Sequence, residues 1–148
     1  MLLIKNKKAH YDYQIDKTWT AGMLLEGREV KSLRLKHASL TGSFVKVVGG
    51  ELFLLNAQIN PYQFAQNDDY DPKRTRKLLL KKNEIATLAQ ATAQKGRAIV
   101  PLEIELVGNL IKLKIGLGRG KKVYEKREII KKRDLDREMR RDSKFSRS

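Results

Sequence analysis

The feature that most constrains the fold is a two-residue alternation of apolar and charged side chains between positions 102 and 117. Leu102, Ile104 and Leu106 alternate with glutamates. After Gly108-Asn109, a second set of apolar residues alternates with lysines. Because successive side chains of a strand point to opposite faces, each half predicts a strand with one buried face. A glycine-asparagine pair suits a tight turn, so we expect an antiparallel hairpin whose glutamates face its lysines.

The same period marks further strands nearer the N-terminus. Residues 44–57 predict a second hairpin, with Gly49-Gly50 as its two-residue turn. Tyr11, Tyr13 and Ile15 alternate with polar residues, which predicts another strand. Two helices are expected to interrupt the strands. One spans about 28–36, and the other begins after an N-cap at Asn83 and ends before a C′ glycine at Gly96.

Short antiparallel strands with tight turns favour a mainly β fold of a particular kind. We expect a small closed antiparallel barrel of the oligonucleotide-binding type. The length of 148 residues fits one domain of ordinary size. No apolar run exceeds four residues, whereas a membrane-spanning helix needs about 20, so we expect a soluble protein that does not span a membrane. A chain without cysteine is compatible with the reducing cytoplasm, where we expect this protein, with no membrane partner. The absence of cysteine excludes a disulfide scaffold and a thiolate zinc site.

The charge of the chain indicates a polyanionic partner. There are 32 Lys and Arg against 17 Asp and Glu, a formal net charge of +15. Cations on this scale gain affinity by displacing counterions from phosphates, which favours nucleic acid, with an anionic membrane surface as the alternative. Residues 119–148 hold 13 Lys and Arg against 6 Asp and Glu, and their few apolar side chains form no helical stripe. We therefore expect an RNA-binding barrel domain over 1–118 and a basic tail over 119–148, disordered when free and helical on a polyanion.

Catalytic machinery is nearly absent from the sequence. The two histidines, His10 and His37, lie in no metal-ligand spacing. Asp68, Asp69 and Asp71 could hold a divalent ion for nuclease chemistry, but an acidic loop before a proline is the preferred interpretation. We expect no enzyme, no cofactor and no metal site.

Basic residues interleaved with aromatic residues are the stronger functional signal. Cations directly precede aromatic residues in Asn6–Tyr13, and four cations occupy five positions in Lys73–Lys77. Cations track phosphates, and exposed aromatic rings stack on bases. On charge and barrel alone, a general single-stranded RNA-binding module is therefore an open alternative to a reader of RNA structure.

Several motifs in a fixed order resemble the small protein B family. They are Asn6-Lys-Lys-Ala with Asp12-Tyr13, Ala21-Gly22, Gly27-Arg-Glu-Val-Lys-Ser-Leu-Arg34, Asp71-Pro with Thr75-Arg-Lys-Leu-Leu-Leu80, and Gly120-Lys-Lys with Lys126-Arg127. The resemblance implies an oligonucleotide-binding-type barrel with about three helices and a basic C-terminal tail. It also implies a monomeric, non-catalytic protein that binds the tRNA-like part of transfer-messenger RNA and delivers it to stalled ribosomes. By resemblance, the body replaces the missing anticodon arm at the decoding centre. The tail then follows ribosomal RNA into the vacant mRNA channel and becomes helical there.

The resemblance also implies functional residues. The RNA-binding set is Asn6, Lys7, Lys8, Thr20, Gly22, Lys31, Arg34, Arg76, Lys77 and Leu79. The ribosome-binding tail set is Lys121, Lys122, Tyr124, Lys126, Arg127 and Lys131. Many relatives have a glutamate where this chain has Thr20, whose hydroxyl can still donate and accept a hydrogen bond. Since three consecutive leucines cannot all face water, we expect Leu78 and Leu80 to be more buried than Leu79.

Overall fold

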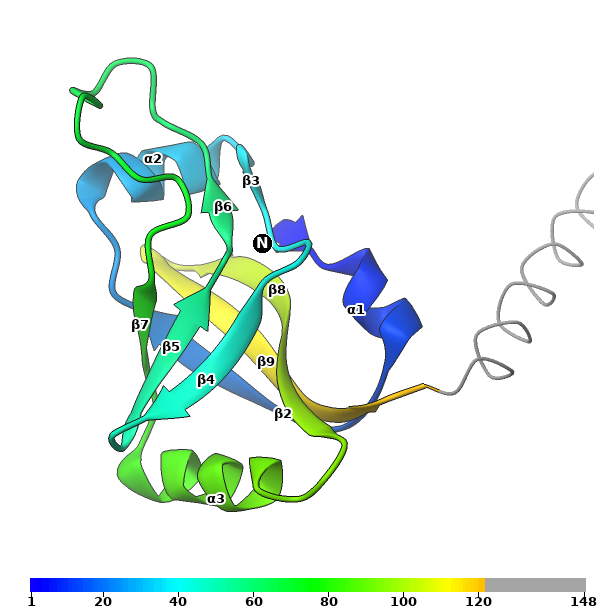
Figure 1. Cartoon of the computed structure of the whole chain (residues 1–148). Helices are drawn as coiled ribbons and strands as arrows, with labels where there is room; N and C mark the ends of the chain where they lie inside the picture. The colour runs from blue at the N-terminus through cyan, green and yellow to red at the C-terminus, as the bar shows by residue number, and fades with distance from the viewer. Residues whose placement is uncertain (122–148) are drawn as a thin grey trace, which may run out of the picture.

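The structure is a computed structural model that describes residues 1–121. Three helices and nine strands follow one another along these residues (Figure 1). In chain order they are β1 (Leu2–Lys5), α1 (Lys7–Asp12), β2 (Tyr13–Met23), α2 (Gly27–Arg34), β3 (Ala38–Ser39), β4 (Phe44–Val48), β5 (Glu51–Leu55), β6 (Gln58–Ile59), β7 (Arg76–Leu79), α3 (Lys82–Thr92), β8 (Arg97–Val107) and β9 (Leu110–Gly120). No helix in this part of the chain is long and apolar enough to cross a membrane.

Seven strands form one antiparallel sheet that returns on itself. Their order is β1-β8-β4-β5-β7-β2-β9, and β9 also pairs with β8, so six of the strands make a ring (Figure 1). The pairing of β4 with β8 is short and has one register pair, Val45 with Ile99. β1 lies outside the ring against β8, and β3 and β6 form a separate two-stranded sheet. The prediction of a mainly β fold with about three helices is confirmed, and the strand ring is consistent with an oligonucleotide-binding-type barrel.

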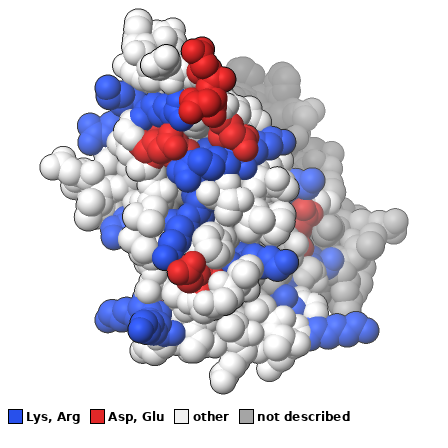
Figure 2. Space-filling model, turned by 60° about the vertical axis from the view of Figure 1, so that its left-hand side comes forward, with Lys and Arg blue, Asp and Glu red and all other residues white. Residues whose placement is uncertain are grey.

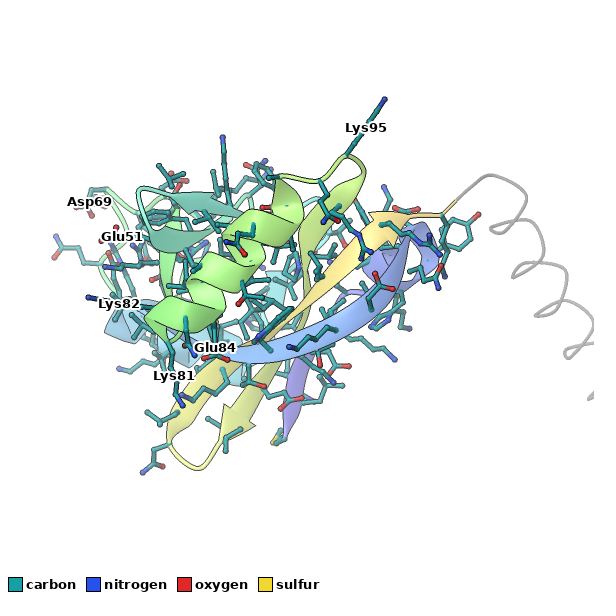
Figure 3. The ribbon with its side chains drawn as sticks, turned by 90° about the horizontal axis from the view of Figure 1, so that it is seen from below. Glu51, Asp69, Lys81, Lys82, Glu84 and Lys95 are labelled. Atoms are coloured by element: carbon teal, nitrogen blue, oxygen red, sulfur yellow. The ribbon has the colours of Figure 1, made fainter. Side chains whose placement is uncertain are left out.

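The core lies inside the strand ring and extends under the helices. Leu52, Leu54 and Leu113 are fully buried in it. α3 lies across one end of the ring (Figure 3). It contributes the buried Leu88 to the core, and α2 contributes Leu33. A smaller cluster beneath α1 contains Ala9, Val100 and Leu102. The long strands β2 and β9 carry several residues of the surfaces described below.

Both predicted hairpins are confirmed. Gly49 and Gly50 turn β4 into β5 with φ of +59° and +76°, and Gly108 turns β8 into β9 with φ of +61°. These left-handed conformations explain why glycines occupy the turns. The register places Glu103 opposite Lys114 and Glu105 opposite Lys112. The charge alternation therefore identified the facing residues correctly.

The strand prediction that included Tyr11 is wrong, because residues 7–12 form helix α1. Asn6 caps this helix: its side-chain oxygen accepts a hydrogen bond from the Ala9 amide at 3.2 Å. Its side-chain amide donates to the Pro101 carbonyl at 2.8 Å. A local cap and the burial of Ala9 outweigh the alternation, and β2 begins only at Tyr13.

The predicted ends of the second long helix are also wrong. α3 begins at Lys82, and the Glu84 carboxylate accepts from the Lys81 amide at 3.3 Å, so Asn83 lies inside the first turn. α3 ends at Thr92. Gly96 has φ of +82° but lies four residues beyond, in the turn that leads into β8. Gly96 therefore serves the turn before β8 and does not end the helix.

Strand β9 runs two residues beyond position 118. β9 extends to Gly120, which pairs with Tyr13. Lys121 then donates its amide to the Asp12 carbonyl at 2.8 Å. Gly116 and Gly118 lie within β9, and the neighbouring strand β2 comes so close to them that it leaves no room for a side chain. A Cβ at Gly118 would lie 2.8 Å from the Gln14 carbonyl oxygen.

Candidate nucleic-acid interface

Three strands bring a leucine, a glycine and a lysine together on the outside of the ring. On β2, Gly22 pairs with Leu79 of β7 on one side and with Lys112 of β9 on the other. A Cβ at Gly22 would lie 3.3 Å from the Leu79 Cβ and 3.8 Å from the Lys112 Nζ. The bare glycine therefore lets an aliphatic side chain and an ammonium group approach the same point. We call Thr20, Gly22, Leu79, Lys112 and Lys114 the β-ring surface.

A groove of about 390 Å³ opens at the end of this surface. It is lined by Gly22, Met23, Leu25, Val30, Leu79, Asn109, Leu110, Ile111 and Lys112. Leu79 is 46% exposed, whereas Leu78 is 1% exposed and Leu80 is half-buried, which confirms the predicted order of the three leucines. Aliphatic walls with an amide and an ammonium group at the rim can contact sugars and base edges while holding a phosphate.

Lys112 and Lys114 were missing from the predicted set. The sequence shows them clearly, but the alternation with Glu103 and Glu105 indicated that these charges would neutralise one another. Among the described residues, neither lysine forms an ion pair with the glutamate opposite. Both ammonium groups are therefore available to a ligand, and Thr20, exposed on β2, pairs with Lys114.

Arg76 and Lys77 begin β7 but differ in what they can offer to a ligand. The Lys77 Nζ lies 3.1 Å from a Glu51 carboxylate oxygen on the outer face. Arg76 is fully buried, with its Nε donating to a Glu29 carboxylate oxygen at 2.7 Å and its Nη1 donating to the Ala57 carbonyl at 2.7 Å. The Arg76 side chain is thus enclosed in this structure and joined to Glu29 and Ala57, whereas Lys77 lies at the surface.

Glu29 is the centre of that buried network. Its carboxylate also accepts from the Arg74 Nη2 at 2.5 Å and from the Glu26 amide at 2.9 Å. Burial acts to raise the pKa of Glu29, but the hydrogen bonds from Arg74 and Glu26 and the charge of Arg76 outweigh it. The pKa of Glu29 therefore lies below its ordinary value of 4.5. The network fixes α2 to the start of β7.

The predicted residues near the N-terminus form a second basic surface. Lys7 and Lys8 are exposed on α1, whereas Asn6 is buried and used as the helix cap, so its side chain is not open to a ligand. The Lys121 Nζ donates to the His10 carbonyl at 2.8 Å. We call Lys7, Lys8 and Lys121 the α1 surface. It adjoins the Tyr13 end of β2, about 30 Å along that strand from Gly22, given a rise of about 3.3 Å per residue.

The two predicted cations of α2 stand apart from both surfaces. Lys31 and Arg34 are exposed, and the Lys31 Nζ lies 5.4 Å from the centre of the Tyr62 ring. Figure 2 shows Lys and Arg side chains distributed over the face that carries α2 and β7, with acidic side chains gathered near its top. The structure therefore distributes the predicted RNA-binding residues over several places rather than one.

The remaining predictions concern the tail and the aspartates. Of the tail set, Lys121 is described, and Lys122, Tyr124, Lys126, Arg127 and Lys131 lie outside the described residues. Within residues 1–121, no three His, Asp or Glu side chains converge so that they could hold a metal ion. Asp68, Asp69 and Asp71 therefore do not form such a group within these residues.

Comparisons with known proteins agree on one family. The chain is 49% identical over 138 residues to the SsrA-binding protein of Geobacter metallireducens, which covers 93% of this chain and 90% of that protein. It is 47% identical over 140 residues to the SsrA-binding protein of Lactobacillus delbrueckii subsp. bulgaricus, covering 95% and 92%. A solved chain from "tmRNA-SmpB: a journey to the center of the bacterial ribosome" superposes with a TM-score of 0.70 at 43% identity, covering 83% of this chain and 87% of that one. The model of the family described as SmpB protein matches residues 3–145, and the chain belongs to this family.

Proposed function

We propose that this protein binds transfer-messenger RNA (SsrA RNA, or tmRNA) through its tRNA-like part and delivers it to stalled ribosomes for trans-translation. The observation that carries the proposal is the meeting of Gly22, Leu79 and Lys112 on three strands that are distant in sequence. Its relatives are named for binding SsrA, and the similar solved chain belongs to a tmRNA-SmpB study of the bacterial ribosome. This is a binding function in the cytoplasm that requires no catalytic group, cofactor or metal.

The composition of the groove supports recognition of RNA structure over general single-strand binding. Proteins that bind single strands without sequence preference use aromatic side chains as stacking platforms. Among residues 1–121, no aromatic side chain lines the groove beside Leu79, and Trp19 of β2 is buried. A surface of aliphatic groups, a hydroxyl and lysines is better suited to the sugars, phosphates and outer edges of a folded RNA.

The position of the α1 surface supports a second set of RNA contacts. It adjoins the point where the chain leaves β9, since Lys121 contacts both His10 and Asp12. A polyanion bound at Lys7 and Lys8 would thus lie beside the start of the basic tail. We infer that this end of the domain faces ribosomal RNA, while the β-ring surface holds the tRNA-like part.

A competition experiment tests the RNA preference. The full chain is bound to a labelled tRNA-like domain at about 150 mM salt, and the label is displaced by unlabelled tRNA-like domain or by an unstructured RNA of equal length. A reader of RNA structure should release the label to the folded competitor at far lower concentration. Equal displacement by both RNAs would instead favour the general single-stranded RNA-binding module, because charge alone does not distinguish RNA shapes.

A further inference from the structure

The loop between β6 and β7 carries the most exposed of the large apolar side chains in residues 1–121. This side chain, Phe64, is 77% exposed, and its ring packs edge-on against Tyr62, at 5.5 Å between centroids. Figure 1 shows the loop projecting beyond α2, away from the strand ring. A phenylalanine with this exposure contributes little to the core, so its ring is available to a binding partner.

Phe64 is presented by a braced loop. The Tyr70 hydroxyl donates to the Ile59 carbonyl at 2.7 Å, and the Ile59 amide donates to the Pro72 carbonyl at 3.0 Å, so the two ends of the loop are tied together. On its inner side, the Arg28 Nη1 donates to the Gln66 carbonyl at 2.7 Å, and the Arg28 guanidinium lies 4.6 Å from the Tyr70 ring centre. Holding the loop in advance reduces the entropy cost of binding through Phe64.

The Asn67 side chain fixes the segment next to Phe64. Its Nδ2 donates to the Tyr62 carbonyl at 2.7 Å and to the Ala65 carbonyl at 3.0 Å. These two carbonyls flank Phe64 in sequence. The backbone under the exposed ring is therefore held from both sides, while the ring itself stays outside.

The charge of the loop distinguishes it from the rest of the molecule. Residues 60–72 contain three aspartates and no Lys or Arg, on a chain of net charge +15. Asp68 and Asp69 are exposed, the Asp69 side chain at 91%, and Figure 3 shows Asp69 at the outer edge of the molecule. Such a tip repels phosphates and attracts a basic surface. RNA is therefore an unfavourable partner for the tip of this loop, even though a cation, Arg28, contacts its inner side.

We propose that Phe64 docks into an apolar recess on a basic protein of the ribosome, with Asp68 and Asp69 meeting its Lys or Arg rim. This inference rests on the proposed function, since it assumes delivery to the ribosome. A ribosomal protein whose surface is rich in Lys and Arg has the charge that complements this loop. Buried aromatic side chains are among the residues that most often dominate the affinity of an interface. The loop gives the domain a protein contact in addition to its RNA contacts.

A photo-crosslinking experiment identifies the partner. Phe64 is replaced by benzoylphenylalanine in the full chain, which is bound with transfer-messenger RNA to purified stalled ribosomes and irradiated. We expect a crosslink to a basic ribosomal protein. A crosslink to RNA, a crosslink to a second copy of this chain, or the absence of any crosslink would each overturn the proposal.

Matched variants measure the contribution of the contact. F64A should leave the melting temperature and the affinity for the isolated tRNA-like RNA unchanged. Its complex should bind stalled ribosomes about thirtyfold more weakly, as for an aromatic residue that dominates an interface. Q63A, an exposed neighbour in the same loop, should behave like the wild type. Unchanged ribosome binding by F64A contradicts this inference alone, whereas failure of the wild type to prefer tRNA-like RNA contradicts the proposed function.

Discussion

At the scale of single residues, the neighbouring Leu78 and Leu79 are expected to serve different roles, Leu78 in stability and Leu79 in RNA binding. The Leu78 side chain points into the core and is 1% exposed, whereas Leu79 faces the groove beside Gly22. Leu78→Ala should lower the free energy of unfolding by about 2–5 kcal/mol, because it leaves a cavity. Leu79→Ala should leave the free energy of unfolding nearly unchanged and weaken binding of the tRNA-like RNA. Urea titration and RNA binding of both variants check this; equal destabilisation by the two would place Leu79 in the core.

Glu29 illustrates how a buried charge links stability to pH. Its carboxylate holds Arg74 and Arg76, and its pKa lies below 4.5 in the folded protein. The unfolded chain binds the proton more readily, so the stability that Glu29 supplies is complete above pH 4.5. It is lost as the pH falls through the lower folded pKa.

Glu29→Gln should therefore destabilise the protein most at neutral pH. Removing one partner of a buried pair costs about 3–5 kcal/mol, and the difference from the wild type should shrink below pH 4.5. Glu51→Gln breaks the exposed pair with Lys77 and should cost at most about 1 kcal/mol. Urea unfolding at pH 7, 5 and 3.5 measures both variants. A Glu29→Gln effect that is independent of pH would show that the charge of Glu29 does not stabilise the fold.

At the scale of the elements, β9 depends on glycine where β2 crosses it. A Cβ at Gly118 would lie 2.8 Å from the Gln14 carbonyl oxygen, a backbone atom that cannot rotate away, whereas a Cβ at Gly120 meets nothing within 4 Å. Gly118→Ala should destabilise the domain by about 1–3 kcal/mol. Gly120→Ala should be neutral or slightly stabilising, since alanine restricts the unfolded chain. Thermal melts compare the two, and equal stabilities would mean that β2 and β9 separate more easily than their pairing indicates.

The two basic surfaces lie on different elements, and salt dependence can distinguish them. Lys112→Ala with Lys114→Ala removes cations of β9, and Lys7→Ala with Lys8→Ala removes the same number from α1. If the β-ring surface holds the tRNA-like part, only the first pair should lower the salt slope of binding to that isolated RNA. The slope should fall by about 0.7–0.9 for each phosphate that the variant no longer neutralises. The reverse result would move the tRNA-like RNA to α1.

At the scale of the whole molecule, the described core is complete before the tail begins. The last buried residue of β9 is Gly118, and the Lys121 amide donates to the carbonyl of Asp12 at the end of α1. A chain truncated after Lys121 should keep its melting temperature and most of its affinity for the tRNA-like RNA, but lose peptide tagging on stalled ribosomes. Tagging at the wild-type level would contradict the role proposed for residues 122–148, and loss of folding would contradict the boundary.

The tail's proposed role follows from its composition. Residues 122–148 hold a net charge of +5 and few apolar side chains, which favours contact with phosphates over docking on a barrel. A control variant truncated after Lys121 and supplied with a shuffled tail of the same composition separates charge from sequence. Rescue of tagging by the shuffled tail would show that charge alone is sufficient.

The sequence by itself determined what depends on local chemistry. A two-residue period, a Gly-Gly or Gly-Asn turn and opposed charges are properties of short segments, and they located both hairpins and paired Glu103 with Lys114. Leu79 was recognised as the outward leucine because the family resemblance gave it a binding role and three consecutive leucines cannot all face water. Tyr11 was assigned wrongly because its conformation depends on Asn6, whose side chain is held by Pro101, 95 residues away.

Only the tertiary structure decided which cations are free and which residues meet. Arg76 looks like a surface cation in a basic run, yet Glu29, 47 positions away, takes it into the core. Lys112 looks neutralised by its own hairpin, yet it reaches the point where Gly22 meets Leu79. Both outcomes arise from closing a ring of strands by pairings between distant segments. Side-chain burial and proximity there depend on the whole sheet, and no local pattern encodes them.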